Sequence, residues 1–193
     1  MRKILIISAI ILLAGCNSAK KGTSGSTAKY TIENLRKMDA QDIERNYPDA
    51  NIKEGTDLFE EGTDERPYTI LYPGTPDELH ITWQDEARSR IHDLRYASNG
   101  KWKSETGVKI GTSYDELTRL NAKPVSFYGF GWDYSGAVVW NDGKLENSGL
   151  RVFLAPQNEH ENKFYGDHII EATPEEIEAL DLEVTSIMIN YAI

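Results

Sequence analysis

Leu79-His-Ile-Thr-Trp83 alternates apolar and polar side chains, which is the pattern of a β-strand with one buried face. A second apolar stretch, Tyr68-Thr-Ile-Leu-Tyr72, precedes it, and the turn-forming segment Pro73-Gly-Thr-Pro-Asp-Glu78 separates the two. A third strand is predicted from Ile91 to Ala97. These residues therefore predict an antiparallel meander, in which consecutive strands are neighbours in the sheet.

Helical patterns precede this meander. Ile32, Leu35 and Met38 recur at helical spacing, and a second helix is predicted to begin near Asp39 and to end before Pro48. The polar, glycine-containing residues 51–67 follow, and no strand is predicted there. The first part of the chain thus reads as helices followed by strands.

The same order is predicted again after Trp102. Thr112 or Ser113 is placed to cap a short amphipathic helix on which Tyr114, Leu117 and Leu120 share one face. The strands expected after this helix are Val125–Tyr134, Ala137–Trp140 and Leu150–Ala155. Two glycines inside the first of them predict a bulge or a bend.

The C-terminal part predicts one more helix and one more strand. Thr173-Pro-Glu-Glu176 combines a capping threonine, a proline at the first helical position and a glutamate three residues after the cap. Residues 184–193 are rich in β-branched side chains and are expected to form the last strand. The predicted class is α+β, with two helix-plus-meander half-repeats, residues 30–100 and 101–193, and helices on one face of a curved antiparallel sheet.

Two stretches carry a resemblance to known families. Gly107-Val-Lys-Ile-Gly-Thr-Ser-Tyr-Asp-Glu-Leu117 resembles the opening of the repeats in the β-lactamase inhibitor protein family and in the small lipoprotein of the outer-membrane barrel-assembly machinery. Leu120-Asn-Ala-Lys-Pro124 and Gly129-Phe-Gly-Trp-Asp133 are similar to uncharacterised lipoproteins of Bacteroidetes-type bacteria. The first resemblance implies helices packed on one face of a curved sheet. Neither implies a known chemistry.

The N-terminus has the features of a lipoprotein signal peptide. Arg2 and Lys3 precede the apolar run Ile4–Leu13, which is too short to span a bilayer, and Leu13-Ala-Gly-Cys16 follows. This resembles the lipobox of bacterial lipoproteins and predicts removal of residues 1–15 and acylation of Cys16. The alternative is an ordinary secretory signal with a chance cysteine.

A polar segment separates this lipidation site from the predicted domain. Residues 16–29 are small and polar, so we expect a flexible tether that places the domain about 20 Å from the membrane. Asn17 stands where an aspartate would retain a lipoprotein in the inner membrane of some Gram-negative bacteria. The predicted location is therefore the cell envelope, with the outer membrane favoured.

Composition narrows the classes of partner. The full chain carries a net charge of −10, and removal of Arg2 and Lys3 with the leader makes it −12. This charge argues against nucleic acid and against electrostatic adsorption to anionic lipid. Cys16 is the only cysteine, and the four histidines show no metal-binding spacing. We expect no cofactor and no metal.

One segment holds the candidate binding residues. Residues 127–140 contain six aromatic side chains, and Trp132, Asp133, Tyr134 and Trp140 form a possible surface that stacks on sugar rings or anchors a partner protein. The alternative is that this stripe packs in the core beneath the helices. Solvent exposure of Trp132 and Tyr134 would favour the binding interpretation.

These observations predict a membrane-anchored envelope lipoprotein that binds another protein or assists assembly, with no recognisable catalytic set. One alternative is a carbohydrate-binding or hydrolytic envelope protein that uses residues 127–140. Another is an enzyme inhibitor, in which a protruding loop such as Pro73–Glu78 or residues 156–168 would enter a cleft.

Substitution Cys16→Ser tests the anchor. Because the acyl chains are the expected attachment to the membrane, the variant is expected to move from the membrane fraction to the soluble fraction on cell fractionation. Unchanged membrane association of Cys16→Ser would contradict the lipoprotein assignment.

Overall fold

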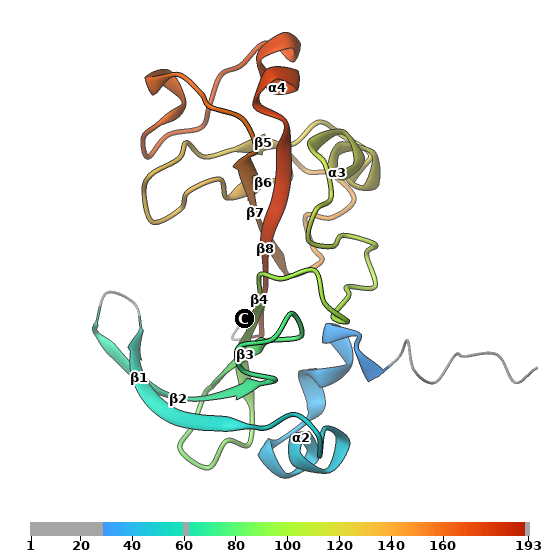
Figure 1. Cartoon of the computed structure of the whole chain (residues 1–193), viewed down its shortest axis with the longest axis vertical. Coiled ribbons are helices and arrows are strands. Elements are labelled where there is room, and N and C mark those ends of the chain that lie inside the picture. Colours follow the sequence, from blue (N-terminus) through green and yellow to red (C-terminus); the bar gives the residue numbers. More distant parts are fainter. Residues whose placement is uncertain (1–28, 60–61, 192–193) are drawn as a thin grey trace, which may run out of the picture.

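The computed structural model describes residues 29–59 and 62–191. The predicted leader, Cys16 and residues 17–28 of the expected tether lie outside the described residues. A six-stranded antiparallel sheet has the order β1-β2-β3-β4-β8-β7 (Figure 1). Its strands are β1 (Lys53–Phe59), β2 (Asp64–Leu71), β3 (Leu79–Trp83), β4 (Ile91–Tyr96), β7 (Leu150–Pro156) and β8 (Leu182–Asn190).

Two halves of the chain meet in the middle of this sheet. Strands β1 to β4 form a meander in chain order, and β4 then pairs with β8 from Asp93↔Asn190 to Tyr96↔Ile187. A small second sheet of β5 (Ser126–Phe127) and β6 (Val138–Val139) lies beside β7 through the Ala137–Phe153 bridge. The predicted α+β class is confirmed.

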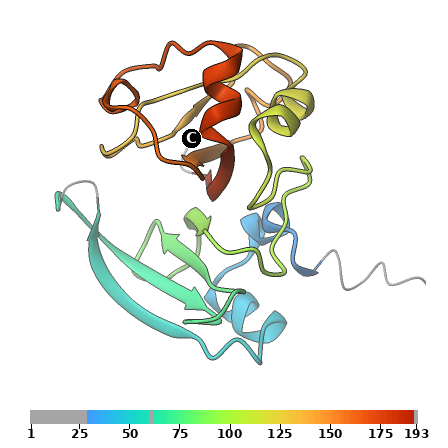
Figure 2. The same ribbon diagram turned by 45° about the horizontal axis from the view of Figure 1, so that its top comes forward.

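Helices lie along one side of the large sheet, as Figures 1 and 2 show. They are the 3₁₀-helix η1 (Ile32–Lys37), α2 (Ala40–Asn46) and α3 (Tyr114–Asn121). The strand side chains that alternate toward the core are almost fully buried, among them Ile81 on β3, Leu94 on β4 and Ile187 on β8. The opposite face of the sheet has no helix over it.

Each regular helix begins as its sequence predicts. Asp39 caps α2 and Thr173 caps α4 (Pro174–Leu180), both with a reciprocal capping box, and Ser113 caps α3 by accepting from the backbone N–H of Glu116. Another 3₁₀-helix, η2 (Asn162–Phe164), lies in the loop before α4. No helix among residues 29–59 and 62–191 has the length and apolar character needed to cross a membrane.

Strand β1 was not predicted. It lies at the free edge of the sheet, and five of its seven residues are exposed, so no apolar alternation marks it. Hydrogen bonding to β2, from Lys53↔Ile70 to Phe59↔Asp64, holds this segment in the extended conformation, which its own sequence does not favour. The absence of a predicted strand in residues 51–67 was therefore wrong.

The strand predicted from Val125 to Tyr134 is also wrong beyond its first residues. Only Ser126–Phe127 forms a strand, and the chain then bends. Gly131 has φ +80° and Gly136 has φ +70°. A Cβ at Gly136 would lie 1.9 Å from the carbonyl oxygen of Leu154, so only glycine allows this close approach of the two backbones.

A buried amide holds the end of α3 to the following turn. Asn121 is fully buried, and its Nδ2 donates to the carbonyl oxygens of Trp140 (2.8 Å) and Lys123 (3.1 Å). Its Oδ1 accepts from the backbone N–H of Leu145 at 3.1 Å. One side chain thus bonds three backbone groups, of which the Trp140 carbonyl oxygen also accepts from the backbone N–H of Gly143 at 3.0 Å.

Substitution Asn121→Ala is expected to lower the free energy of unfolding by about 2–4 kcal/mol, because it removes three hydrogen bonds and leaves the buried N–H of Leu145 without this acceptor. Urea denaturation measures the change. The matched control is Asn147→Ala, which removes an exposed amide and is expected to change stability by less than about 0.5 kcal/mol. Equal effects of the two substitutions would contradict this role.

Candidate functional site

The uncovered face of the sheet is the candidate functional site, and we call it the concave face. Strand alternation directs Arg66 and Tyr68 of β2, His80 of β3, Arg95 of β4 and Arg151 of β7 to this side, whereas their neighbours enter the core. All of these side chains are exposed or half-buried. Six adjoining strands therefore present a continuous solvated surface.

One row of residues runs across the whole face. Register pairs Lys53 with Ile70, Ile70 with His80, His80 with Arg95, Arg95 with Met188, and Met188 with Arg151. We call these six residues the basic row. The row has three permanent cations, one imidazole and two apolar side chains, and it contains no carboxylate.

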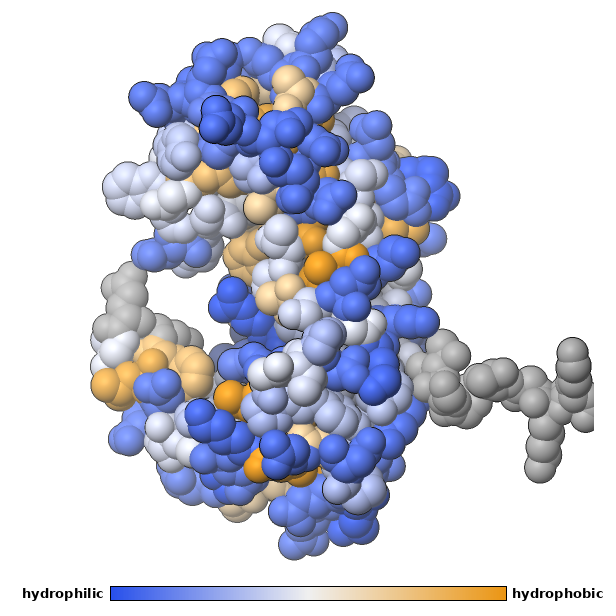
Figure 3. Space-filling model, viewed as in Figure 1, coloured by the Kyte–Doolittle hydropathy of each residue, from blue (hydrophilic) through white to orange (hydrophobic). Residues whose placement is uncertain are grey.

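Two hollows lie along this row. One of about 500 Å³ is lined by residues of all six strands, including Tyr68, His80 and Arg95. Another of about 610 Å³ adjoins it and is lined by Asp133, Tyr134, Arg95 and Arg151 among others. Figure 3 shows the open space between the β1–β2 hairpin and the second half of the chain. The two hollows share Arg95, Arg151 and Met188, so they form one groove.

The loop after β5 supplies exposed aromatic side chains at one end of this groove. Trp132 is 61% exposed and Tyr134 is 59% exposed, and Asp133 between them is also exposed. The Ser135 hydroxyl accepts from the backbone N–H of Gly131 at 3.1 Å, which closes the turn that carries them. The structure therefore brings together three of the four predicted surface residues.

Trp140 does not belong to this surface. It is 6% exposed, and its indole N–H donates to the carbonyl oxygen of Leu150 at 3.1 Å inside the core. Phe127 and Phe130 are buried as well, with stacked rings 5.8 Å apart. The aromatic segment is thus divided, because the chain bends after Phe127 and the period-two pattern ends there.

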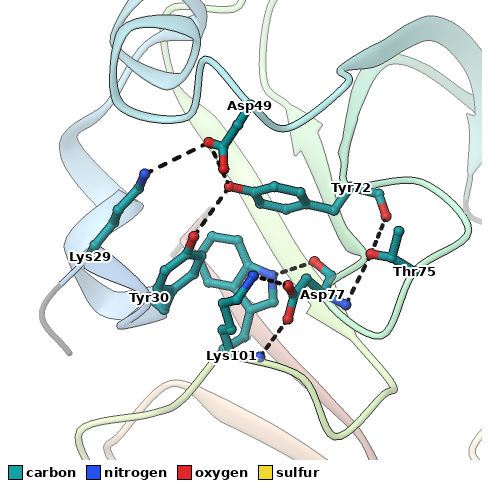
Figure 4. Close-up of polar contacts among 8 residues, drawn as sticks. Lys29, Tyr30, Asp49, Tyr72, Thr75, Asp77 and Lys101 are labelled. Atoms are coloured by element: carbon teal, nitrogen blue, oxygen red, sulfur yellow. Dashed lines mark hydrogen bonds and ion pairs between the residues drawn. The ribbon is translucent and has the colours of Figure 1, made fainter. Parts of the chain in front are cut away.

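A second polar cluster lies at the other end of the molecule, near the start of the described chain (Figure 4). The rings of Tyr30 and Tyr47 lie 5.3 and 5.5 Å from the Trp102 ring, and the Tyr47 hydroxyl donates to the carbonyl oxygen of Lys29. Lys101 forms an ion pair with Asp77 and lies over the Tyr30 ring.

Burial keeps the hydroxyls of this cluster protonated. It raises the pKa of Tyr47 to about 12, with a smaller effect from Tyr30. Burial is also the largest cause of the strongly raised pKa of Tyr72, followed by its hydrogen bond with Tyr30 and the nearby Asp49 carboxylate. A tyrosinate base is therefore not accessible near neutral pH, and the cluster fixes the start of the domain.

Two imidazole–carboxylate pairs line the concave face, and the Thr82 hydroxyl donates to the Asp93 carboxylate of one of them at 3.4 Å. His80 Nε2 lies 2.7 Å from Glu78 Oε1, and His92 Nδ1 lies 2.8 Å from Asp93 Oδ2. Within residues 29–59 and 62–191, no hydroxyl hydrogen-bonds to either imidazole, and no group of three metal-ligating side chains occurs. In this geometry neither imidazole is placed to accept a proton from a hydroxyl group of the described residues.

The cationic residues of the groove were not singled out from the sequence. His80 and Arg95 occupy polar positions of alternating strands, so their orientation could have been inferred locally. Their alignment with Lys53 and Arg151 depends on pairing between β4 and β8, whose residues are about ninety apart in the chain. No local signal could have shown that alignment.

Comparisons with known proteins complete the description. No family model matches the chain, and no curated protein matches it. Among solved structures, the chain is similar to the crystal structure of the uncharacterized protein yfeY from Escherichia coli, with 14% sequence identity and a TM-score of 0.46. The match covers 76% of this chain and 87% of that chain. Function is therefore inferred from the geometry of the concave face itself.

The division of the aromatic segment is testable by stability. The double variant Trp132→Ala/Tyr134→Ala removes exposed rings and is expected to unfold within about 0.5 kcal/mol of the parent. Trp140→Ala removes a buried ring and its hydrogen bond, so we expect a loss of about 3–5 kcal/mol in thermal or urea unfolding. A large loss in the double variant would show instead that those rings are part of the core.

Proposed function

We propose that this protein is a membrane-anchored lipoprotein of the bacterial cell envelope, and that its concave face binds a partner protein without catalysing a reaction. The observation that supports this most is the six-strand face, which holds a two-part groove with the exposed loop of Trp132 and Tyr134 at one end. A sheet face of this width that no helix covers is available to a partner.

The distribution of exposed apolar residues supports a protein partner. Tyr134 lines the second hollow and is 59% exposed, and Trp132 on the same loop is 61% exposed. Tyr165 and Ile169 are also exposed and lie on the loop that bridges to Phe130 and Tyr128. Exposed large apolar side chains gathered at a groove are typical of protein interfaces.

The types of residue that line the groove also support a protein partner. Tyr68, Arg95, Arg151 and Met188 line it, and aromatic residues, arginine and methionine are the types enriched at interfaces. The Tyr68 ring lies over Gly55, where a Cβ would come within 2.6 Å of the Tyr68 hydroxyl. The absence of a side chain at Gly55 therefore leaves room for the Tyr68 ring on the groove side of the sheet.

Carbohydrate binding is the second candidate, because Trp132 and Tyr134 flank the exposed Asp133 on one loop. Flat rings beside a carboxylate suit stacking and hydrogen bonding to a sugar. The inhibitor alternative has less support. In the turn Pro73–Glu78 only Gly74, Thr75 and Pro76 are exposed, and Trp102 Nε1 donates to the Asp77 carbonyl oxygen at 2.7 Å.

A photo-cross-linking amino acid placed at position 68 tests the proposal in intact cells. The expected result is one discrete protein adduct from position 68, since this side chain lines the groove. The matched control is position 44, where Glu44 is exposed on α2, on the helical side of the sheet. Position 44 is expected to give no adduct of that size.

Two results would contradict a protein-binding concave face. One is equal cross-linking from positions 68 and 44, which would indicate random collision. The other is no protein adduct together with sedimentation of the purified domain with peptidoglycan or envelope polysaccharide. If Trp132→Ala/Tyr134→Ala abolished that sedimentation, the carbohydrate-binding function would replace the proposal.

A further inference from the structure

We propose that the basic row of the concave face binds an acidic, extended segment of the partner protein. This inference rests on the proposed function, because it specifies the chemistry of the partner for the same face. The juxtaposition that carries it is Lys53, His80, Arg95 and Arg151 in one line across six strands, with Ile70 and Met188 between them.

The permanent cations of the row form no ion pair among the described residues, although the charge of Lys53 is close enough to Glu78 to help lower the pKa of that carboxyl. Among residues 29–59 and 62–191, the ion pairs involve other lysines and arginines, and none includes Lys53, Arg95 or Arg151. Arg95 donates from Nε to the Ser186 hydroxyl at 3.2 Å, and the rest of its guanidinium is not used. Although the chain has a net charge of −10, these three cations lie in one line across one face of the sheet.

Most carboxylates near the row already have a partner, and for Glu78 that partner is His80 of the row itself. Glu78 accepts from the backbone N–H of Gly74 and pairs with His80, and these contacts hold the pKa of Glu78 below its usual value. Asp93 contacts His92, and Asp57 accepts from the backbone N–H of Leu58 at 2.9 Å. Asp133 lines the second hollow without an ion pair, so it limits the cationic surface at that end.

The spacing of the row indicates an extended polypeptide. Neighbouring strands lie about 4.8 Å apart, so the five intervals from Lys53 to Arg151 span about 24 Å. An extended chain rises about 3.3 Å per residue, and about seven residues would therefore cross the face at right angles to the strands. Arg95 and Arg151 are two strand intervals apart, about 10 Å. Two carboxylates that bind to them would therefore be about three residues apart in the peptide.

The arrangement suits carboxylates better than a phosphate group. A phosphate site needs several donors directed at one point, whereas these cations are dispersed along a line and separated by apolar side chains. Each guanidinium can receive one carboxylate through two parallel hydrogen bonds. Ile70 and Met188 are half-buried and offer apolar contact to residues between the acidic ones.

The probe for this inference is a fluorescein-labelled deca-glutamate peptide, with deca-glutamine as the neutral reference. In fluorescence anisotropy with the purified domain, we expect deca-glutamate to bind and deca-glutamine not to bind. The double variant Arg95→Gln/Arg151→Gln is expected to weaken binding roughly tenfold. Binding is also expected to weaken as salt is raised, because exposed charge pairs are screened.

The matched control is Arg45→Gln/Arg119→Gln. These arginines are exposed on α2 and α3 and form only local i,i+3 ion pairs, so the substitutions change the net charge equally on the helical side of the molecule. The control is expected to change affinity by less than about twofold. Circular dichroism checks that both variants keep the parent fold.

Each remaining result would overturn the inference. An equal loss of deca-glutamate affinity in both double variants would show that the peptide responds only to the net charge of the protein. Competition by millimolar inorganic phosphate equal to that by free deca-glutamate would indicate a simple anion site. Self-association lost in Arg95→Gln/Arg151→Gln, with no peptide bound, would assign the face to a second copy. A position-68 protein adduct without deca-glutamate binding would refute the acidic segment while leaving the proposed function standing.

Discussion

The pairing of β4 with β8 is the constraint on which the rest of the structure depends. It joins the β1–β4 meander to the β7–β8 pair in one sheet through the pairs from Asp93↔Asn190 to Tyr96↔Ile187. Leu94 and Ile189 are opposite one another in this pairing and are both buried. A shift by one residue would turn these side chains out of the core, so burial enforces the register.

The same register creates the candidate site. Once Leu94 and Ile189 enter the core, the alternation of the strands places Arg95 and Met188 on the opposite face. Arg151 follows through its own pairing with Met188. The register of β4, β8 and β7 therefore both buries the apolar side chains beneath the helices and aligns the groove residues on the face proposed to bind the partner.

The aromatic segment shows how a bend separates roles that a regular strand would mix. A strand through residues 127–134 would place Phe130, Trp132 and Tyr134 on one face. Glycine conformations at Gly131 and Gly136 turn the chain, so Phe130 packs in the core while Trp132 and Tyr134 reach solvent beside the groove. The core interpretation is correct for Phe130, and the solvent exposure that the binding interpretation requires is found at Trp132 and Tyr134.

The sequence by itself determined the α+β class, the starts of α2, α3 and α4, and the buried strands β3 and β4, because caps and apolar alternation act over a few residues. Only the tertiary structure decided the rest. Edge strand β1 is exposed, so it forms through its hydrogen bonds to β2 and not through a pattern of its own. The basic row and the burial of Trp140 likewise arise from contacts between distant segments, which no local pattern encodes.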